Sequence, residues 1–503
     1  MKKKGDYLLK IFDIGISLTT EKDPNKLLEM ILKESREITH ADAGTLYIRK
    51  NDKLHFKIIQ NQTLNIFQGE NGESIDLPPL NIEGDSVSAY VARTKKTLNI
   101  SNIYEESDSY LEGPKKYDKM TGYKTESMLV IPLIDREYVV IGVMLLINAK
   151  TPEGKIVPFL KYYERVIAYY ASQVAMYISN MNYLEEIHAL FNSFVEVMVK
   201  AIDKRTRYNA NHTKNIVVFL QKFLPYINNI THGELASQYF NRDRTEEIVM
   251  AAWLHDIGKL AIPLNIMDKP TRLAEKYEVV IKRIHLEKLQ VKIYMLEGKI
   301  NNEEYRSRTD FLDEVEKIIE ICNSPNKYID DELLKKLENL YKYEPIGDEK
   351  RLLLDDEYEY IIVRRGTLTD KERKIMQDHV IFTKEMLNRI PFTEKLKHVN
   401  MWASMHHEFL DGSGYPEGVD IKSIPFEVRI LTMLDIFEAL VSADRPYKKP
   451  MERKEAIGVL KSMAKDGKLD KTLVLEFEKS EVWMLEVGDQ KSDVGSYEGR
   501  GEL

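Results

Sequence analysis

The segment Ala251-Ala252-Trp253-Leu254-His255-Asp256-Ile257-Gly258-Lys259 ends an apolar helix on a histidine and an aspartate side by side. A neutral imidazole and a carboxylate are good ligands for a divalent metal ion, and the two carboxylate oxygens can bridge two ions. Gly258 then frees the backbone to turn, and Lys259 adds a positive charge. A single His-Asp pair is more often an ordinary polar helix end, so a metal site needs further residues.

Histidines and acids of the same kind recur in the C-terminal half. His379 closes the segment 376–379, and His406-His407-Glu408 follows a helix predicted over 399–405, directly before Asp411-Gly412-Ser413-Gly414-Tyr415-Pro416. Asp435 lies within the otherwise apolar segment 431–437. A carboxylate buried there is costly unless it is paired or bound to a metal. The pattern therefore predicts that these side chains converge on a metal site.

In this order, His212, His255-Asp256 and Asp435 resemble the pattern of the HD phosphohydrolase superfamily. The residues His379, His406-His407-Glu408 and Gly414-Tyr415-Pro416 are similar to its HD-GYP branch, the cyclic di-GMP phosphodiesterases. The resemblance extends to Ile262-Pro263, Lys269-Pro270, Leu368-Thr369, Ile424-Pro425, Arg429-Ile430 and Arg445-Pro446-Tyr447. It implies an all-α catalytic domain that hydrolyses cyclic di-GMP, with linear pGpG or GMP as the alternative final products.

The resemblance also implies a site with two divalent metal ions. The first would be held by His212, His255, Asp256 and Asp435, and Asp256 would bridge to a second held by His379, His406 and His407. Asp256 and Lys259 would be catalytic, and the substrate would meet Lys259, Arg445, Lys448, Tyr415, Gly412 and Gly414. Ligands of this kind without thiolate suit Fe or Mn, with Zn, Co and Ni as alternatives; the family favours Fe or Mn.

Two positions depart from the branch. Some members carry a glutamate four residues before the first histidine, which supports a third metal, where this chain has Tyr208. One extra residue separates Asp435 from Arg445-Pro446-Tyr447, which leaves the roles of Arg445 and Lys448 open. The alternatives to cyclic di-GMP hydrolysis are hydrolysis of 3'3'-cyclic GMP-AMP or another phosphoester, and a silent scaffold that docks GGDEF-type cyclase partners.

The first 160 residues predict an α+β unit. A helix over 26–38 and strands over 44–48, 54–58, 128–133 and 139–147 follow from the apolar periodicity. Their order resembles a GAF sensor domain, which implies a small-molecule ligand of unknown identity. Asn148, Lys150, Phe159 and Tyr163-Glu164 match part of the cyclic-nucleotide signature of such domains, without its aspartate.

We expect a GAF-like domain over 1–160, a linker helix over 161–190, an HD-GYP domain over 191–485 and a disordered tail over 486–503. An inserted helical hairpin or small bundle is expected over 273–365, with Leu286, Leu289, Ile293 and Leu296 at heptad-like spacing. The linker helix either packs on its own domain or pairs with a second copy, and the pairing is favoured. Its apolar stripe is Val166, Tyr170, Val174, Tyr177, Met181 and Leu184.

Composition excludes several classes of protein. The 503 residues carry a formal net charge of -8 with both signs interspersed, so no basic face for duplex nucleic acid is predicted. Cys322 is the single cysteine, which excludes a disulfide framework and favours a cytoplasmic location. The most apolar stretch, 128–147, is interrupted by Asp135-Arg136-Glu137, and no membrane span is predicted.

Overall fold

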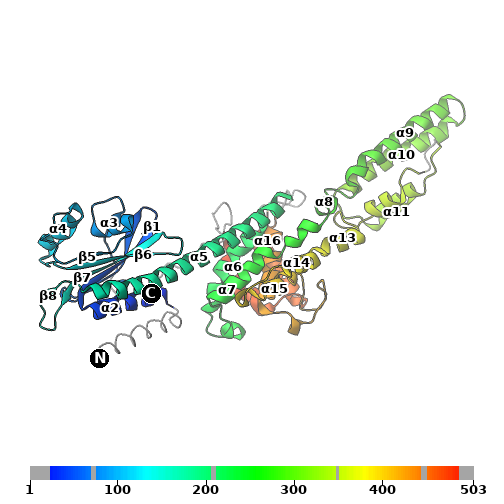
Figure 1. The fold of residues 1–503 in the computed structure, drawn as a ribbon. Coiled ribbons are helices and arrows are strands. Elements are labelled where there is room, and N and C mark those ends of the chain that lie inside the picture. Colours follow the sequence, from blue (N-terminus) through cyan, green and yellow to red (C-terminus); the bar gives the residue numbers. More distant parts are fainter. Residues whose placement is uncertain (1–22, 70–74, 206–210, 347–350, 443–449, 486–503) are drawn as a thin grey trace. The chain divides into compact units, whose positions relative to one another are not determined.

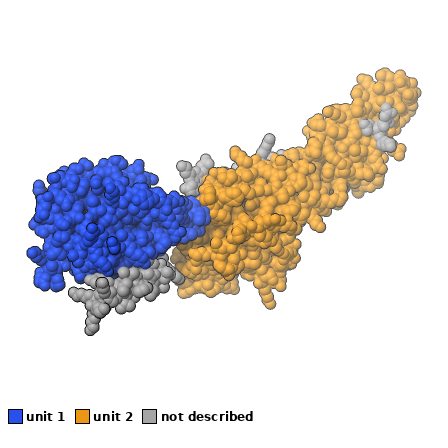
Figure 2. Space-filling model, in the orientation of Figure 1, with its two compact units in different colours: residues 1–189 blue, residues 190–503 orange. Residues whose placement is uncertain are grey.

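The computed structural model describes residues 23–69, 75–205, 211–346, 351–442 and 450–485. The chain divides into two compact units, residues 1–189 and 190–503 (Figure 2). Among the described residues, no helix is both long enough and apolar enough to cross a membrane.

Unit 1 is built on an antiparallel sheet with the strand order β3-β2-β1-β7-β6-β5 (Figure 1). The longest strands, β1 and β7, pair at its centre and are buried over most of their length, which explains their nearly continuous apolar sequences. The strands are β1 (Ala41–Lys50), β2 (Lys53–Asn61), β3 (Ile66–Gln68), β4 (Leu80–Asn81), β5 (Leu98–Ile100), β6 (Met128–Ile134), β7 (Val140–Lys150) and β8 (Ile156–Val157). The strands predicted from periodicity are all present.

Helices cover both faces of this sheet. On one face, α2 (Pro24–Thr39) packs together with the first part of α5 (Lys161–Arg205), and on the other lie α3 (Val87–Thr94) and α4 (Glu112–Thr121). Helix α2 begins where the Asp23 carboxylate accepts the main-chain N–H groups of Asn25 and Lys26. Its Leu27, Ile31 and Leu32 side chains are fully buried. Unit 1 is thus the α+β domain that the sequence predicts.

The apolar stripe predicted for the linker helix is largely used within unit 1. Tyr170 and Val174 are fully buried in the core of unit 1, and Val166 and Tyr177 pack against that core. The stripe between residues 166 and 177 therefore packs on its own domain, the first of the two alternatives, whereas Leu184 at its end is exposed. A different stripe of α5 is exposed instead, at a spacing of seven residues: Tyr162, Tyr169, Met176 and Tyr183.

Unit 2 is helical. Its main core gathers side chains from α6 (His212–Asn228), α7 (Arg242–Leu254), α14 (His379–Leu387), α15 (Val399–Ser404), α16 (Phe426–Val441), α17 (Arg453–Lys465) and α18 (Lys471–Lys479). Two short helices, α8 (Leu264–Met267) and α13 (Asp370–Gln377), lie between α7 and α14. At the centre of the core, Phe437 packs edge-on against Phe219 and Phe477.

The segment between α8 and α13 has a hydrophobic core of its own. It consists of α9 (Tyr277–Leu296), α10 (Asn302–Asn323), α11 (Asp331–Tyr341) and α12 (Asp355–Ile361), with α9 and α10 side by side (Figure 1). This core uses Val280, Ile284 and Val291 of α9. The residues at heptad-like spacing are exposed: Leu286, Leu289, Ile293 and Leu296. The residues that face α10 lie on the other side of the helix.

Arg272 closes this segment at its base. Its fully buried guanidinium donates to the main-chain oxygens of Val363 at 2.7 Å, Cys322 at 2.7 Å and Lys327 at 2.6 Å, and also to that of Ser324. Two of these carbonyls, at residues 322 and 324, belong to the C-terminal end of α10, where the helix dipole favours a cation. The Arg272 side chain therefore joins the start of the segment, the end of α10 and the stretch of chain that follows α12.

We predict that Arg272→Met lowers the free energy of unfolding by about 3 kcal/mol, because several buried carbonyls lose a charged donor at once. Urea unfolding of the full chain measures the change. Arg306→Met, on the exposed side of α10, removes the same charge without buried partners and should change stability little. Equal losses in the two variants would contradict the role given to Arg272.

Candidate metal centre

His255 and Asp256 reach the site because the chain turns sharply after α7. The turn is held against α14 by Thr383, whose hydroxyl donates to the carbonyl of His255 at 3.0 Å and accepts the N–H of Gly258 at 3.0 Å. A Cβ atom at Gly258 would lie only 1.9 Å from the carbonyl oxygen of His379. Glycine is therefore required for α14 to approach closely enough to bring His379 beside Asp256.

Three histidines of the site share one local arrangement. In each, Nδ1 lies 2.6 or 2.7 Å from the carbonyl oxygen three residues earlier, at the end of a helix or helical turn. The pairs are His255 with Ala252, His379 with Met376, and His406 with Ala403. Because a carbonyl only accepts, Nδ1 carries the hydrogen and Nε2 is left with a free lone pair. This is the form of histidine that binds a metal.

The free lone pairs have no hydrogen-bond partner among the described residues. Nε2 of His255, His379 and His406 and Oδ1 of Asp256 are all buried and unpartnered. Buried polar atoms without partners are rare because each costs free energy. Four such atoms lie together here. Ligand atoms of a metal site are buried in this way, because the metal takes the place of a hydrogen-bond partner. The donor set therefore fits a divalent cation.

Asp256 lies between two groups of histidines. Its Oδ2 is 3.3 Å from Nε2 of His255 and 3.8 Å from Nε2 of His212, and its Oδ1 is 3.5 Å from Nε2 of His379 and 4.0 Å from Nε2 of His406. Each oxygen thus faces a different group. Two sets of ligand atoms lie within 4.8 Å of one another and could each hold a metal ion: His212, His255 and Asp256, and His379, His406 and His407.

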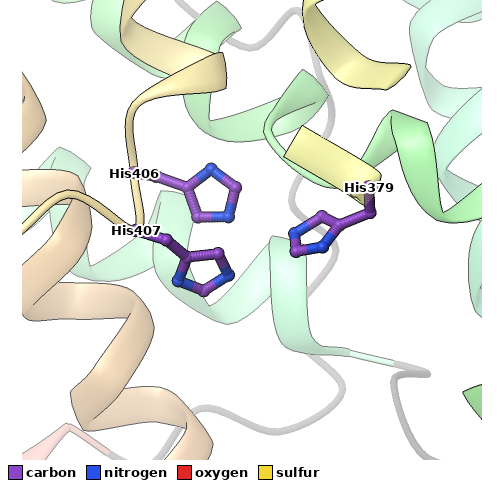
Figure 3. Close-up of side chains that lie close together, drawn as sticks. All are labelled: His379, His406 and His407. Carbon is purple, nitrogen blue, oxygen red and sulfur yellow. The ribbon is translucent and has the colours of Figure 1, made fainter. Parts of the chain in front are cut away.

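The second set is assembled from two segments far apart in the sequence. His379 begins α14, and His406 and His407 follow α15 (Figure 3). The ring centroid of His379 lies 5.6 Å from that of His406 and 5.2 Å from that of His407. The three rings turn toward a common space, as Figure 3 shows. His379 therefore faces His406, as a shared metal would require.

Asp435 joins the two groups from α16. Its Oδ1 lies 3.0 Å from Nε2 of His212 and 4.0 Å from Nε2 of His255, and its Oδ2 lies 3.8 Å from Nδ1 of His407. All seven residues predicted as metal ligands, from His212 to Asp435, are thus brought together. The Asp435 carboxylate has a histidine near each oxygen, His212 at Oδ1 and His407 at Oδ2. These partners offset the cost of burying its charge in an apolar helix.

Glu438 is a member of the site that was not recognised in the sequence. Its buried carboxylate contacts Nδ1 of His212 and accepts from Nδ2 of Asn215 at 2.8 Å. It holds the His212 ring with Nε2 directed at Asp435. The signal was available, because Glu438 lies one helical turn after Asp435 and so shares its face of an apolar helix.

The protonation states suit metal binding at the second set. Burial lowers the pKa of His407 to about 3, and it also lowers the pKa of His379 and His406, so all are neutral at pH 7. Burial alone would raise the pKa of Asp256, but the ammonium group of Lys259 and the neighbouring His255 hold it well below its usual range. Asp256 is therefore a carboxylate.

Lys259 and the glycine-rich loop border the ligands. Nζ of Lys259 contacts Oδ2 of Asp256, so the ammonium group is paired with this carboxylate. The ring of Tyr415 lies 4.7 Å from that of His407. A Cβ at Gly414 would lie 2.3 Å from the main-chain nitrogen of Phe409, so the loop folds back on the histidine segment only with glycine there.

Two glutamates support this arrangement from outside. Glu408, which follows the histidine pair, is buried and accepts the N–H groups of Glu417 at 2.8 Å, Gly418 at 3.3 Å and Val419 at 3.3 Å. It shapes the loop that includes Gly412, and it is not directed at the metal ligands. In the same way Glu372 caps α13 through Thr369 and binds Lys269 at 2.8 Å, which positions the helix that leads to His379.

Five residues named in the sequence analysis lie outside the described residues: Tyr208, Arg445, Pro446, Tyr447 and Lys448. The predicted tail over 486–503 also lies outside them. Their expected roles stay predictions.

We predict that Glu438→Ala weakens metal binding about 10- to 100-fold, because His212 loses the partner that orients it. Elemental analysis after dialysis against a series of chelator concentrations measures the affinity. The control is Glu427→Ala on the same helix, which removes a carboxylate that pairs with Arg244 at 2.7 Å away from the histidines. Loss of metal in both variants would show a general effect of stability and contradict a positioning role.

Two family models match the chain. The GAF domain model matches residues 23–178, and the HD domain model matches residues 358–473. The second range contains His379, His406, His407 and Asp435, and it begins within α12. His212, His255 and Asp256 precede it, as do α9 to α11. A solved GAF domain, from an Acinetobacter phosphoenolpyruvate-protein phosphotransferase, is 14% identical and covers 36% of this chain and 97% of its own, with a TM-score of 0.28.

Relatives of known name match parts of the chain. A cyclic di-GMP phosphodiesterase of Thermotoga maritima is 30% identical over 240 residues, which cover 42% of this chain and 62% of the relative. The 3'3'-cGAMP-specific phosphodiesterase 3 of Vibrio cholerae is 39% identical over 101 residues, which cover 20% of this chain and 21% of the relative. The chain thus spans less than two thirds of either relative. Residues 23–178 form a GAF domain, and residues 358–473, which include His379, His406, His407 and Asp435, belong to the HD domain family.

Proposed function

We propose that unit 2 is a metal-dependent phosphodiesterase that opens cyclic di-GMP to linear pGpG, which a second hydrolysis converts to GMP. The observation that carries this proposal is the position of Asp256, with one oxygen toward His212 and His255 and the other toward His379 and His406. The name of the Thermotoga maritima relative, and the HD family itself, support the same reaction class.

Two divalent cations fit the site, one at His212, His255, Asp256 and Asp435, the other at His379, His406 and His407 with Asp256 between them. Bound there, such ions supply an activated water and neutralise charge on the phosphoryl oxygens. Nitrogen and oxygen ligands without thiolate favour Fe or Mn within the proposal.

The side chains around the ligands have separate tasks in this scheme. Lys259, already in contact with Asp256, is placed to donate a hydrogen bond to a phosphoryl oxygen, since its ammonium group borders the bridging carboxylate. Tyr415 and the loop of Gly412 and Gly414 would form a wall beside His407. Arg445 and Lys448 would meet the second phosphate of the substrate. Hydrolysis adds water to phosphorus and breaks the bond to the ribose oxygen, which leaves as a hydroxyl.

Hydrolysis of 3'3'-cyclic GMP-AMP is the second candidate. The Vibrio cholerae relative of that specificity has the higher identity, 39% against 30%, although over a shorter segment. The two substrates differ only in one base, and the described metal-binding residues meet phosphate and not base. A silent scaffold is less well supported, because every predicted metal ligand is retained and buried or half-buried at one place.

Regulation and partners complete the proposal. The GAF domain would bind a small molecule and control hydrolysis, and GGDEF-type cyclases, which make the substrate, are candidate partners. A cytoplasmic location is favoured by the single cysteine and by the nucleotide substrate. The exposed stripe of α5, Tyr162, Tyr169, Met176 and Tyr183, would pair with the same stripe of a second copy, because its seven-residue repeat is that of a coiled coil.

Asp256→Ala is expected to reduce hydrolysis of cyclic di-GMP by more than about 100-fold and to lower the bound metal, since it removes the carboxylate shared by both ions. The protein is prepared anaerobically and analysed for metal and for turnover together. Asp466→Ala, an exposed aspartate after α17, is the matched control and should retain both. Full activity of Asp256→Ala would defeat the two-metal assignment.

The substrate is decided by comparing kcat/KM for cyclic di-GMP and 3'3'-cyclic GMP-AMP on the same metal-loaded preparation. We expect the higher value for cyclic di-GMP. A preference for 3'3'-cyclic GMP-AMP would transfer the proposal to the second candidate, and failure to hydrolyse either would leave the scaffold interpretation.

For the dimer, Tyr169→Glu combined with Met176→Glu should convert a dimer to a monomer, because charges would face one another across the pairing stripe. Light scattering after size-exclusion chromatography gives the mass. Ala168→Glu, exposed on another side of α5, should leave the dimer intact. A wild-type chain that is monomeric at all concentrations tested would contradict the proposed dimer.

A further inference from the structure

Unit 1 contains a cavity of about 850 Å³ that is remote in sequence from the metal ligands. It is formed by the last turns of α2 and by the ends of β1, β2 and β7, with Phe67 of β3 also lining it. A volume of this size falls within the range of small-molecule sites. The cavity could therefore hold a ligand of the size of a mononucleotide or smaller.

The residues of the partial cyclic-nucleotide signature are engaged in structural contacts. The side-chain oxygen of Asn148 accepts the N–H groups of Glu126 at 2.8 Å and Ser127 at 3.3 Å. Glu164 accepts from Asn99 at 2.9 Å, and Phe159 is buried in the core. These three side chains serve structural contacts, whereas Lys150 of the same signature lines the cavity.

One acid of the cavity is already neutralised. The buried carboxylate of Asp42 lies 2.6 Å from Nζ of Lys150, and it accepts the hydroxyl groups of Thr63 at 2.9 Å and Tyr123 at 2.8 Å. Lys150 thus balances the charge of Asp42. Burial opposes this charge, but these donors hold the pKa of Asp42 below its usual range.

Arg36 forms no ion pair with a described residue, and the nearby carboxylates of Asp42 and Glu37 favour its charge only from a longer distance. Its side chain is 7% exposed, and it donates to neutral oxygens, the side-chain oxygen of Gln60 at 3.0 Å and the main-chain oxygen of Asp42 at 2.8 Å. Within the described part of the chain, its buried Nε atom has no hydrogen-bond partner and no carboxylate lies at ion-pair distance from the guanidinium. A buried positive charge in this state is costly unless an anion reaches it.

We propose that this cavity binds a small organic anion, whose carboxylate or phosphate group pairs with Arg36. The cavity is lined by the cations Lys33, Arg36 and Lys150 and by the carboxylates of Glu37 and Asp42, so positive charge is in excess. The exposed ring of Phe67 offers an apolar surface for the rest of the ligand. Arg36 favours such groups because its planar donors match their oxygens. The site lies in the GAF domain and does not depend on the phosphodiesterase proposal.

The test uses the full chain with phenyl phosphate and benzoate as anionic probes and benzamide as the neutral probe, measured by titration calorimetry. The decisive variant is Gln60→Glu, which keeps the size of the side chain and places a carboxylate on Arg36, so that the charge is balanced from within. We expect it to weaken binding of the anions at least tenfold while thermal stability is kept or raised. Phe67→Ala, on an exposed side chain, should weaken binding without unfolding the domain.

Lys96→Gln is the control, because it removes an exposed charge outside the cavity and should leave binding unchanged. Binding of phenyl phosphate alone would assign a phosphate ligand, and binding of benzoate alone a carboxylate ligand. Equal binding by the wild type and Gln60→Glu, tighter binding of benzamide than of the anions, or no binding of either anion at millimolar concentration would overturn the proposal. Hydrolysis of cyclic di-GMP is measured separately, so failure here is distinguishable from failure of the catalytic assignment.

Discussion

Everything in unit 2 depends on one constraint: the lone pairs of several buried imidazoles must point at Asp256. Each of His255, His379 and His406 gives its Nδ1 hydrogen to a carbonyl three residues earlier. The end of a helix or helical turn is the natural place for this, since its last carbonyls have no partner within the helix. The same geometry that satisfies a helix end thus prepares a metal ligand, and this happens three times around one carboxylate.

That constraint explains features that are distant from the ligands. The turn after α7 must come within van der Waals contact of α14, which is why Gly258 lies against the carbonyl of His379 and why Thr383 is used to join the two backbones. Glu438 and Glu408 are buried for a similar reason, because one orients His212 and the other folds the loop after the histidine pair. Burial of these two carboxylates is tolerated because each accepts hydrogen bonds from neighbouring N–H groups.

The segment α9–α12 shows how a long insertion can leave such a site intact. It has a separate core, and Arg272 gathers its two ends, so the histidines on either side of it are brought together by the main core. Unit 1 follows a different principle. There the charge of Asp42 is balanced within the domain, whereas no described carboxylate forms an ion pair with Arg36, which points to a component from outside.

The sequence by itself predicted the two domain types and the seven candidate metal ligands. The His-Asp and His-His pairs near glycine indicated a metal site, and the resemblance to the HD phosphohydrolase superfamily supplied the full set. The strands of unit 1 were also predictable, since apolar alternation and charged turns are local properties. Only the tertiary structure decided which neighbour each apolar stripe of a helix packs against. Tyr170 and Val174 turned out to pack on their own sheet, and Leu286 and Leu289 turned out to be exposed. Periodicity shows that a helix has an apolar side, but it does not show which neighbour covers that side. Glu438 and Arg36 were missed for the same reason: the meaning of a buried charge depends on partners that folding brings from elsewhere in the chain.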